Sequence, residues 1–165
     1  MEEPEAIVAV LEEYFSTEQD YQGKHVLLTA GPTYEPIDPV RFIGNHSTGK
    51  MGIALANEFA RRGAEVTLIL GPSSLRPREE VRVLPVMTAE EMLRVAEDNI
   101  GEADIAIFAA AVADYRPLHS SDEKLKREEK GARTRSQSRY SCYARLLEAT
   151  QPILCRLCPR EQCGL

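Results

Sequence analysis

Residues 25–32 read HVLLTAGP, a short apolar run closed by glycine and proline. Such a run is typical of a strand buried on both faces of a parallel sheet, with a turn at its carboxyl end. Three more runs of this kind are predicted to be strands, at residues 65–70, 81–86 and 104–110.

Helical periodicity separates these strands. Apolar residues recur every four positions over residues 50–62, and a second helix is predicted over 88–99, where Thr88 and Glu91 match a capping box. Strands that alternate with helices form βαβ units with right-handed crossovers. The predicted fold is therefore α/β and Rossmann-like, a mostly parallel sheet with helices on both faces.

Composition limits the class of protein. The chain has 165 residues, of which 43% are hydrophobic and 28% charged, and its net charge is −6. This composition is globular, and the length suits one compact domain. The acidic balance disfavours nucleic acid as a partner. No apolar run approaches the ~20 residues that span a bilayer, and the N-terminus does not resemble a secretion signal, so we expect no membrane association and a cytoplasmic location.

Charge and cysteine content divide the chain near residue 128. Residues 1–24 are predicted to be a connector, with an amphipathic helix over 6–15 and then a polar linker, and residues 25–127 form the α/β domain. Residues 128–165 differ, because they hold all four cysteines together with six arginines. The cysteines lack a fourth ligand for zinc, and the three histidines are scattered, so no protein-bound metal is predicted.

The segment 31–49, between the first strand and its helix, is expected to bind a ligand. Ligands of parallel sheets bind beyond the carboxyl ends of the strands, and this connection is far longer than the usual ~2–6 residues. It ends in small polar residues at a helix start, where free N–H groups and the helix dipole favour an anion. A phosphate group is the expected ligand. The alternative is that Gly49 and Gly52 only allow close contact between helix and sheet.

Two nucleotide-binding fingerprints match this segment only in part. Residues 44–50 fit G-x-x-x-x-G-K, but Met51 stands where a P-loop has the Ser or Thr that holds magnesium. Residues 48–53 are similar to a glycine-rich dinucleotide loop, yet no acidic residue ends the second strand to bind a ribose hydroxyl. Each fingerprint therefore lacks a residue that its nucleotide-binding motif requires, and neither motif is predicted here.

A second candidate segment follows the fourth strand, where residues 108–117 read FAAAVADYRP. The small side chains leave room for a flat ring or a sugar, and Asp114 can accept hydrogen bonds from hydroxyls or bind a cation. Ten residues later, residues 123–127 supply positive charge. The alternative for this charged run is a solvated surface.

Two long motifs resemble bacterial phosphopantothenate–cysteine ligases. They are LTAGPTYEPIDPVRFIGNHSTGKMG at 28–52 and AAAVADYRP at 109–117, and the likeness covers about residues 1–127. In many bacteria this ligase is the C-terminal half of a bifunctional coenzyme A biosynthesis protein. The resemblance implies that 4′-phosphopantothenate and L-cysteine are joined through an acyl-cytidylate made from CTP, with Mg²⁺ accompanying the nucleotide, in a homodimer.

The resemblance also implies roles for single residues. Asn45 is expected to be catalytic by steadying the acyl-nucleotide intermediate, and Arg41 is expected to support the same loop. Lys124 corresponds to a lysine that meets the triphosphate. The full nucleotide-binding set implied is Gly31, Ser47, Gly49, Phe108, Ala109, Ala110, Asp114 and Lys124.

Beyond Arg127 the resemblance stops. Residues 128–165 are therefore predicted to be an out-of-frame or disordered tail of a C-terminally truncated ligase. Two other functions stay open, a nicotinamide-dependent oxidoreductase and a non-functional remnant. The ligase hypothesis requires that Asn45 and Asp114 meet at one end of the sheet.

Overall fold

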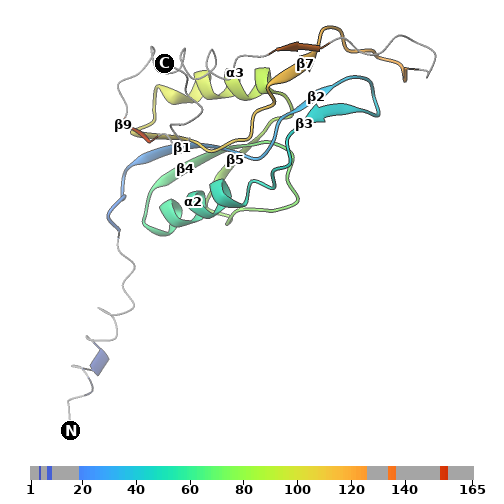
Figure 1. Ribbon diagram of the computed structural model, residues 1–165. Coiled ribbons are helices and arrows are strands. Elements are labelled where there is room, and N and C mark those ends of the chain that lie inside the picture. Colours follow the sequence, from blue (N-terminus) through green and yellow to red (C-terminus); the bar gives the residue numbers. More distant parts are fainter. Residues whose placement is uncertain (1–3, 5–6, 9–18, 126–133, 137–152, 156–165) are drawn as a thin grey trace, which may run out of the picture.

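The computed structural model describes residues 4, 7–8, 19–125, 134–136 and 153–155. Its centre is a five-stranded parallel sheet in the order β5-β4-β1-β6-β9 (Figure 1). The helix predicted over 6–15 lies outside the described residues except at positions 7 and 8. The strands of the sheet are β1 (His25–Ala30), β4 (Glu65–Leu70), β5 (Arg82–Pro85), β6 (Ile105–Phe108) and β9 (Ile153–Cys155).

The sheet is covered by one helix on each face, α2 (Lys50–Arg61) and α3 (Ala89–Ile100) (Figure 1). Alternate residues of β1 point to opposite faces of the sheet. Val26 and Leu28 pack in the core that includes α2, and Leu27 packs in the core that includes α3. A strand with two buried faces needs apolar residues at every position. The predicted parallel sheet with helices on both faces is confirmed.

The two helices begin differently. At α3, Thr88 Oγ1 accepts a hydrogen bond from the Glu91 N–H at 3.2 Å, and Glu91 Oε2 accepts one from the Thr88 N–H at 3.3 Å, so the predicted capping box is confirmed. Helix α2 begins after Gly49, whose φ of 74° is left-handed and which has no side chain to cap the helix. The Gly49 N–H donates to Ser47 Oγ at 3.3 Å and the Lys50 N–H donates to Thr48 Oγ1 at 3.4 Å, and among the described residues the Met51 and Gly52 N–H groups have no acceptor. The N-terminus of α2 therefore keeps these two amide groups available to a ligand.

Two predicted strands are shorter in the structure. β5 is one residue shorter at each end than the predicted strand 81–86. β6 stops at Phe108, whereas the prediction extended it to residue 110. Beyond Phe108, the Ala109 N–H still donates to Thr29 O at 3.0 Å, but the Ala110 N–H points to the Thr29 hydroxyl at 3.4 Å. A side chain thus replaces the backbone acceptor, and the regular ladder ends.

The segment 31–49 is not simply a loop, because it contains an antiparallel hairpin. β2 (Tyr34–Pro36) pairs with β3 (Phe42–Gly44), and we call residues 34–44 the hairpin arm. The rings of Tyr34 and Phe42 stack at 4.0 Å. The arm lies beyond the carboxyl ends of the parallel strands, where β7 (Tyr115–Pro117) packs against it (Figure 1).

Two strands come from the predicted tail. β8 (Thr134–Ser136) pairs antiparallel with β7, and β9 pairs parallel with β6. The rest of residues 126–165 lies outside the described residues. The out-of-frame origin of this segment stays a prediction.

Gly52 allows α2 to approach β1 closely, and this contact yields the first test. A methyl group at Gly52 would overlap the methyl group of Ala30. We therefore expect Gly52→Ala to lower the free energy of unfolding by ~1–3 kcal/mol, the usual cost of overpacking, as measured by urea denaturation.

Gly101→Ala is the matched control for this test. Gly101 has open space around it and a helical φ of −63°, so alanine should leave stability unchanged or raise it by ~0.4–1 kcal/mol. Equal stability of the two variants would show that α2 and β1 are not in close contact.

Candidate functional site

The candidate site lies where the chain leaving β1 runs beside the chain leaving β6. The Ala111 N–H donates to Gly31 O at 2.8 Å, and the Ala113 N–H donates to Thr33 Oγ1 at 2.9 Å. The two chains thus stay paired past the ends of their strands. This pairing brings segment 31–49 and the residues after β6 together at the carboxyl edge of the sheet.

Asn45 joins these two segments. Its Nδ2 donates to Val112 O at 2.9 Å and lies 3.4 Å from Ala111 O. Both amide hydrogens are thereby directed at the protein, and among the described residues no donor is recorded for the Asn45 Oδ1. The side chain is held in one orientation, with its oxygen available to a ligand.

An open pocket of about 550 Å³ lies beside Asn45. It is lined by residues 45–52 together with Tyr34 and Ala109. One side is therefore the loop that carries Asn45, another is the first turn of α2, and a third is the end of β6. The volume is within the ~300–1,000 Å³ range of small-molecule sites.

The first turn of α2 gives the pocket a positive end. Helix α2 has no acidic residue in its first turn, and Lys50 adds a cation. The Met51 and Gly52 N–H groups, which have no acceptor among the described residues, and the helix dipole together favour an anion such as phosphate. Gly49 approaches Gly31 so closely that a Cβ atom there would lie 3.1 Å from the Gly31 nitrogen, so backbone forms the base of this turn.

Four predicted site residues line this pocket: Asn45, Ser47, Gly49 and Ala109. Two more predicted residues lie next to it, because Gly31 contacts Gly49 and Ala110 follows Ala109. The packing alternative for Gly49 and Gly52 also agrees with the structure, since both glycines lie against β1 or its extension.

Arg41, Phe108, Asp114 and Lys124 do not line the pocket. Phe108 packs against the core beneath α3. Asp114 is two residues from Val112, the partner of Asn45, so Asn45 and Asp114 lie at the same end of the sheet although they do not share this cavity. Lys124 is exposed.

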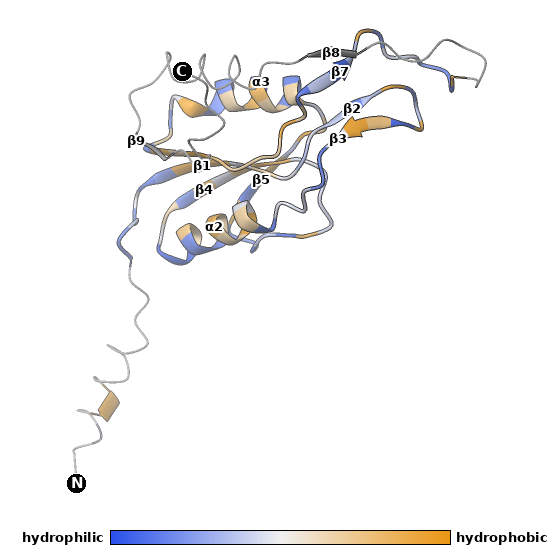
Figure 2. Ribbon diagram, viewed as in Figure 1, coloured by the Kyte–Doolittle hydropathy of each residue, from blue (hydrophilic) through white to orange (hydrophobic). Residues whose placement is uncertain are grey.

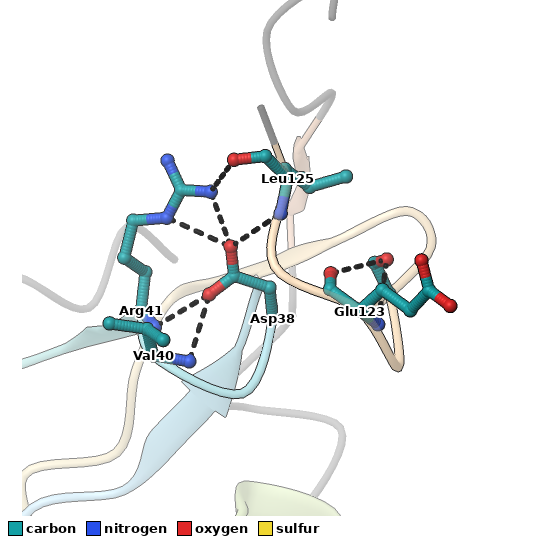
Figure 3. Close-up of polar contacts among 6 residues, drawn as sticks. Asp38, Val40, Arg41, Glu123 and Leu125 are labelled. Atoms are coloured by element: carbon teal, nitrogen blue, oxygen red, sulfur yellow. Dashed lines mark hydrogen bonds and ion pairs between the residues drawn. The ribbon is translucent and has the colours of Figure 1, made fainter. Parts of the chain in front are cut away.

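Arg41 contacts Asp38 and Leu125 rather than the loop of Asn45 (Figure 3). Its Nε donates to Asp38 Oδ2 at 2.9 Å, its Nη2 donates to the same oxygen, and Nη2 also donates to Leu125 O at 3.1 Å. The expectation that Arg41 supports the loop of Asn45 is not met by these contacts. Arg41 instead links the hairpin arm to the segment that carries Lys124.

Asp38 was not among the residues predicted from the sequence. Its side chain is buried. The Arg41 guanidinium holds the pKa of this carboxyl well below its usual range, against the opposing effect of burial, and the N–H groups of Val40, Arg41 and Leu125 lower it further. The available signal was the spacing of Asp38 three residues before Arg41, which permits a turn closed by the Asp side chain.

Glu35 is a second buried carboxylate that the sequence did not reveal. Its Oε1 accepts a hydrogen bond from the Ala89 N–H at 2.9 Å, at the N-terminus of α3. A negative charge at this end of a helix is stabilising. Glu35 therefore fixes the hairpin arm to the helix layer of the domain.

Comparison with known proteins identifies the family. The model of the DNA/pantothenate metabolism flavoprotein C-terminal domain matches residues 21–142. The chain belongs to this family. The match extends past residue 127, where the resemblance in sequence was expected to end.

Three known proteins show the extent of the similarity. The coenzyme A biosynthesis bifunctional protein CoaBC of Haemophilus influenzae is 49% identical over 127 residues, which cover 77% of this chain and 32% of that protein. A cysteine/cysteine sulfinic acid decarboxylase from an unknown prokaryotic organism is 53% identical over 132 residues, covering 77% of this chain and 37% of that protein. The crystal structure of a CoaBC C-terminal domain superposes with a TM-score of 0.72 at 37% identity, covering 83% of this chain and 65% of that one.

The chain therefore spans about a third of the curated relatives that it matches. Within the described residues, no helix is both long enough and apolar enough to cross a bilayer. The same part of the chain contains no cluster of three or more His, Cys, Asp or Glu side chains placed to hold a metal ion.

The low pKa of Asp38 predicts how acid affects stability. A carboxyl whose pKa is lowered by folding stabilises the native state above its ordinary pKa of 3.8, and this contribution is lost as the pH falls through the native pKa. We expect urea denaturation to show Asp38→Asn as less stable than the parent at pH 7. The difference should narrow below about pH 4, and a difference that stays constant with pH would contradict the ion pair.

Proposed function

We propose that this chain forms the nucleotide-binding part of a phosphopantothenate–cysteine ligase that acts in coenzyme A biosynthesis. The observation that carries the proposal is the pocket at the start of α2, with Asn45 fixed against Val112 on its border. The family match and the CoaBC relatives support the same function. The proposed substrates are 4′-phosphopantothenate, L-cysteine and CTP.

The proposed reaction activates a carboxylate, because a carboxylate at neutral pH is a poor acyl donor. A carboxylate oxygen of 4′-phosphopantothenate attacks the α-phosphorus of CTP, the bond to the β-phosphate breaks, and pyrophosphate leaves. The amine of cysteine then attacks the acyl carbon, CMP leaves with the electrons of the acyl–oxygen bond, and the amine loses a proton. No protein nucleophile takes part, so the protein contributes positioning and charge stabilisation.

The site residues suit these tasks. The first turn of α2 offers a phosphate the Met51 and Gly52 N–H groups, which have no acceptor among the described residues, and Lys50 adds positive charge. Asn45 is oriented by Val112 before any ligand arrives, so its Oδ1 is already placed to accept a hydrogen bond from an N–H or O–H group of a substrate and to position it. The small side chain of Ala109 leaves space beside this group.

Magnesium is proposed to enter with CTP. The described residues form no carboxylate cluster that would hold the ion by itself. A magnesium ion bound to the triphosphate offsets the repulsion among its charges. We assign no protein ligand to it.

Pyrophosphate release tests the proposed function. The full chain is incubated with CTP, magnesium, 4′-phosphopantothenate and cysteine, and CTP binding is measured in parallel by calorimetry. Asn45→Ala should slow pyrophosphate release by ~100-fold, the order of effect expected when a group that positions a substrate is lost.

Asn99→Ala is the control for this assay. Among the described residues, the Asn99 amide donates to Val95 O within α3, at 2.7 Å, and its loss should leave the rate close to that of the parent. Binding of NADPH without any response to CTP would overturn the ligase assignment in favour of an oxidoreductase.

Self-association is a further part of the proposal, because the resembled family is homodimeric. Apolar side chains are exposed on the hairpin arm at Val40 and Phe42, and near β7 at Tyr115 and Leu118. Figure 2 shows the apolar colour of β3 at the outer part of the molecule. Burial of such side chains between two copies would be favourable.

Sedimentation velocity tests this association. We expect the parent to sediment as a dimer and Phe42→Asp to shift it toward the monomer, because a charge would be buried at the interface. Glu97→Asp, on the exposed surface of α3, serves as the control. A monomeric parent would rule out the dimer.

A further inference from the structure

The Asp38 carboxylate is a buried charge that the proposed reaction does not use. Its Oδ1 accepts hydrogen bonds from the Val40 N–H at 2.9 Å and the Arg41 N–H at 2.8 Å, which close the turn of the hairpin arm. Its Oδ2 accepts from the Arg41 guanidinium and, at 3.2 Å, from the Leu125 N–H (Figure 3). One carboxylate therefore joins two segments that are 87 residues apart in the sequence.

The segment 121–125 is held by this turn at both of its ends. The Ser121 N–H donates to Ile37 O at 3.0 Å. At the other end, Leu125 donates to Asp38 and accepts from Arg41 at 3.1 Å. Between these two anchors, the Ser121 side chain bonds to Glu123, which shapes the segment into a tight turn. Lys124 lies one residue before the Leu125 anchor and is exposed.

We propose that Asp38 is a positioning residue for the nucleotide, because it fixes the backbone on which Lys124 is presented to the triphosphate of CTP. This inference rests on the proposed function and on the family resemblance, which implies that Lys124 meets the triphosphate. Asp38 does not itself touch the nucleotide. It acts through the Leu125 amide and through Arg41.

Fixing this backbone should strengthen CTP binding because a long exposed side chain loses conformational entropy when it binds a phosphate. A lysine that binds phosphate loses side-chain freedom, and if its backbone is also mobile, the ordering of that backbone reduces the affinity further. Asp38 provides this ordering before CTP binds. An asparagine has the same shape, but it lacks the charge that Arg41 requires and carries one acceptor oxygen in place of two.

A double-mutant cycle measured by calorimetry tests the proposal. CTP with magnesium is titrated into the full chain of the parent, Asp38→Asn, Lys124→Ala and the double variant. Asp38→Asn alone should weaken CTP binding by about tenfold or more, as expected for the loss of a charged hydrogen-bonding group. In the Lys124→Ala background, the same change should have almost no further effect, because Asp38 acts through Lys124.

Asp104→Asn is the matched control. Asp104 is also a carboxylate that joins distant segments, since it accepts from Lys24 at 3.1 Å and from the His25 N–H at 2.9 Å. These contacts lie at the opposite ends of β1 and β6 from the site. The control should retain the parent affinity for CTP, which separates positioning from a general loss of stability.

Two results would overturn the positioning role. One is that Asp38→Asn weakens CTP binding equally in the parent and in the Lys124→Ala background. The other is that Asp38→Asn alone leaves the affinity for CTP unchanged. If Asp38→Asn does not fold, Asp38→Ser replaces it in the cycle, because a serine hydroxyl can still accept from the Val40 and Arg41 N–H groups but lacks the second oxygen that accepts from Leu125. If the parent binds no CTP, the proposed function itself is wrong and the positioning role fails with it.

Discussion

The site depends on the hydrogen bonds that continue the pairing of β1 and β6 beyond the ends of both strands. The Ala111 N–H donates to Gly31 O and the Ala113 N–H donates to the Thr33 hydroxyl, so the segments that follow β1 and β6 run side by side beyond the sheet. The carbonyl of Val112 is thereby presented to Asn45. Without this pairing, Asn45 would lose its carbonyl partners and the pocket would lose one of its sides, although Ser73 Oγ would still donate to Thr48 O at 2.7 Å.

Glycine is required where this edge is most crowded. Gly31 and Gly49 have φ values of 81° and 74°, which favour glycine, and a Cβ atom on either would press against another backbone. The base of the pocket is consequently made of main chain. Because Gly49 has no side chain to cap α2, the same glycine that permits this close approach leaves the Met51 and Gly52 N–H groups, which have no acceptor among the described residues, able to meet an anion.

The sequence predicts the parallel sheet and both covering helices, because their signals are local. These signals are the apolar runs, the apolar residues at every fourth position, and the Thr88–Glu91 capping box. It does not reveal the hairpin arm or β7, since strands of three residues show no periodicity. The structure places Asn45 beside the chain that leaves β6, whereas Arg41, which the resemblance implied to support the same loop, contacts Asp38 and Leu125. The contact between Asp38 and Leu125 joins residues far apart in the chain, and no local pattern predicts it. The roles of Phe108, Asp114 and Lys124 stay predictions.

The central claim is that the pocket at the start of α2 binds CTP. Amide chemical shifts measured by NMR during a titration with CTP and magnesium test it most directly. We predict that the largest changes fall on residues 45–52 and 109–112. Changes confined to the second hollow, about 320 Å³ beside His25, Glu65 and Asn99 at the opposite end of the strands, would contradict the account.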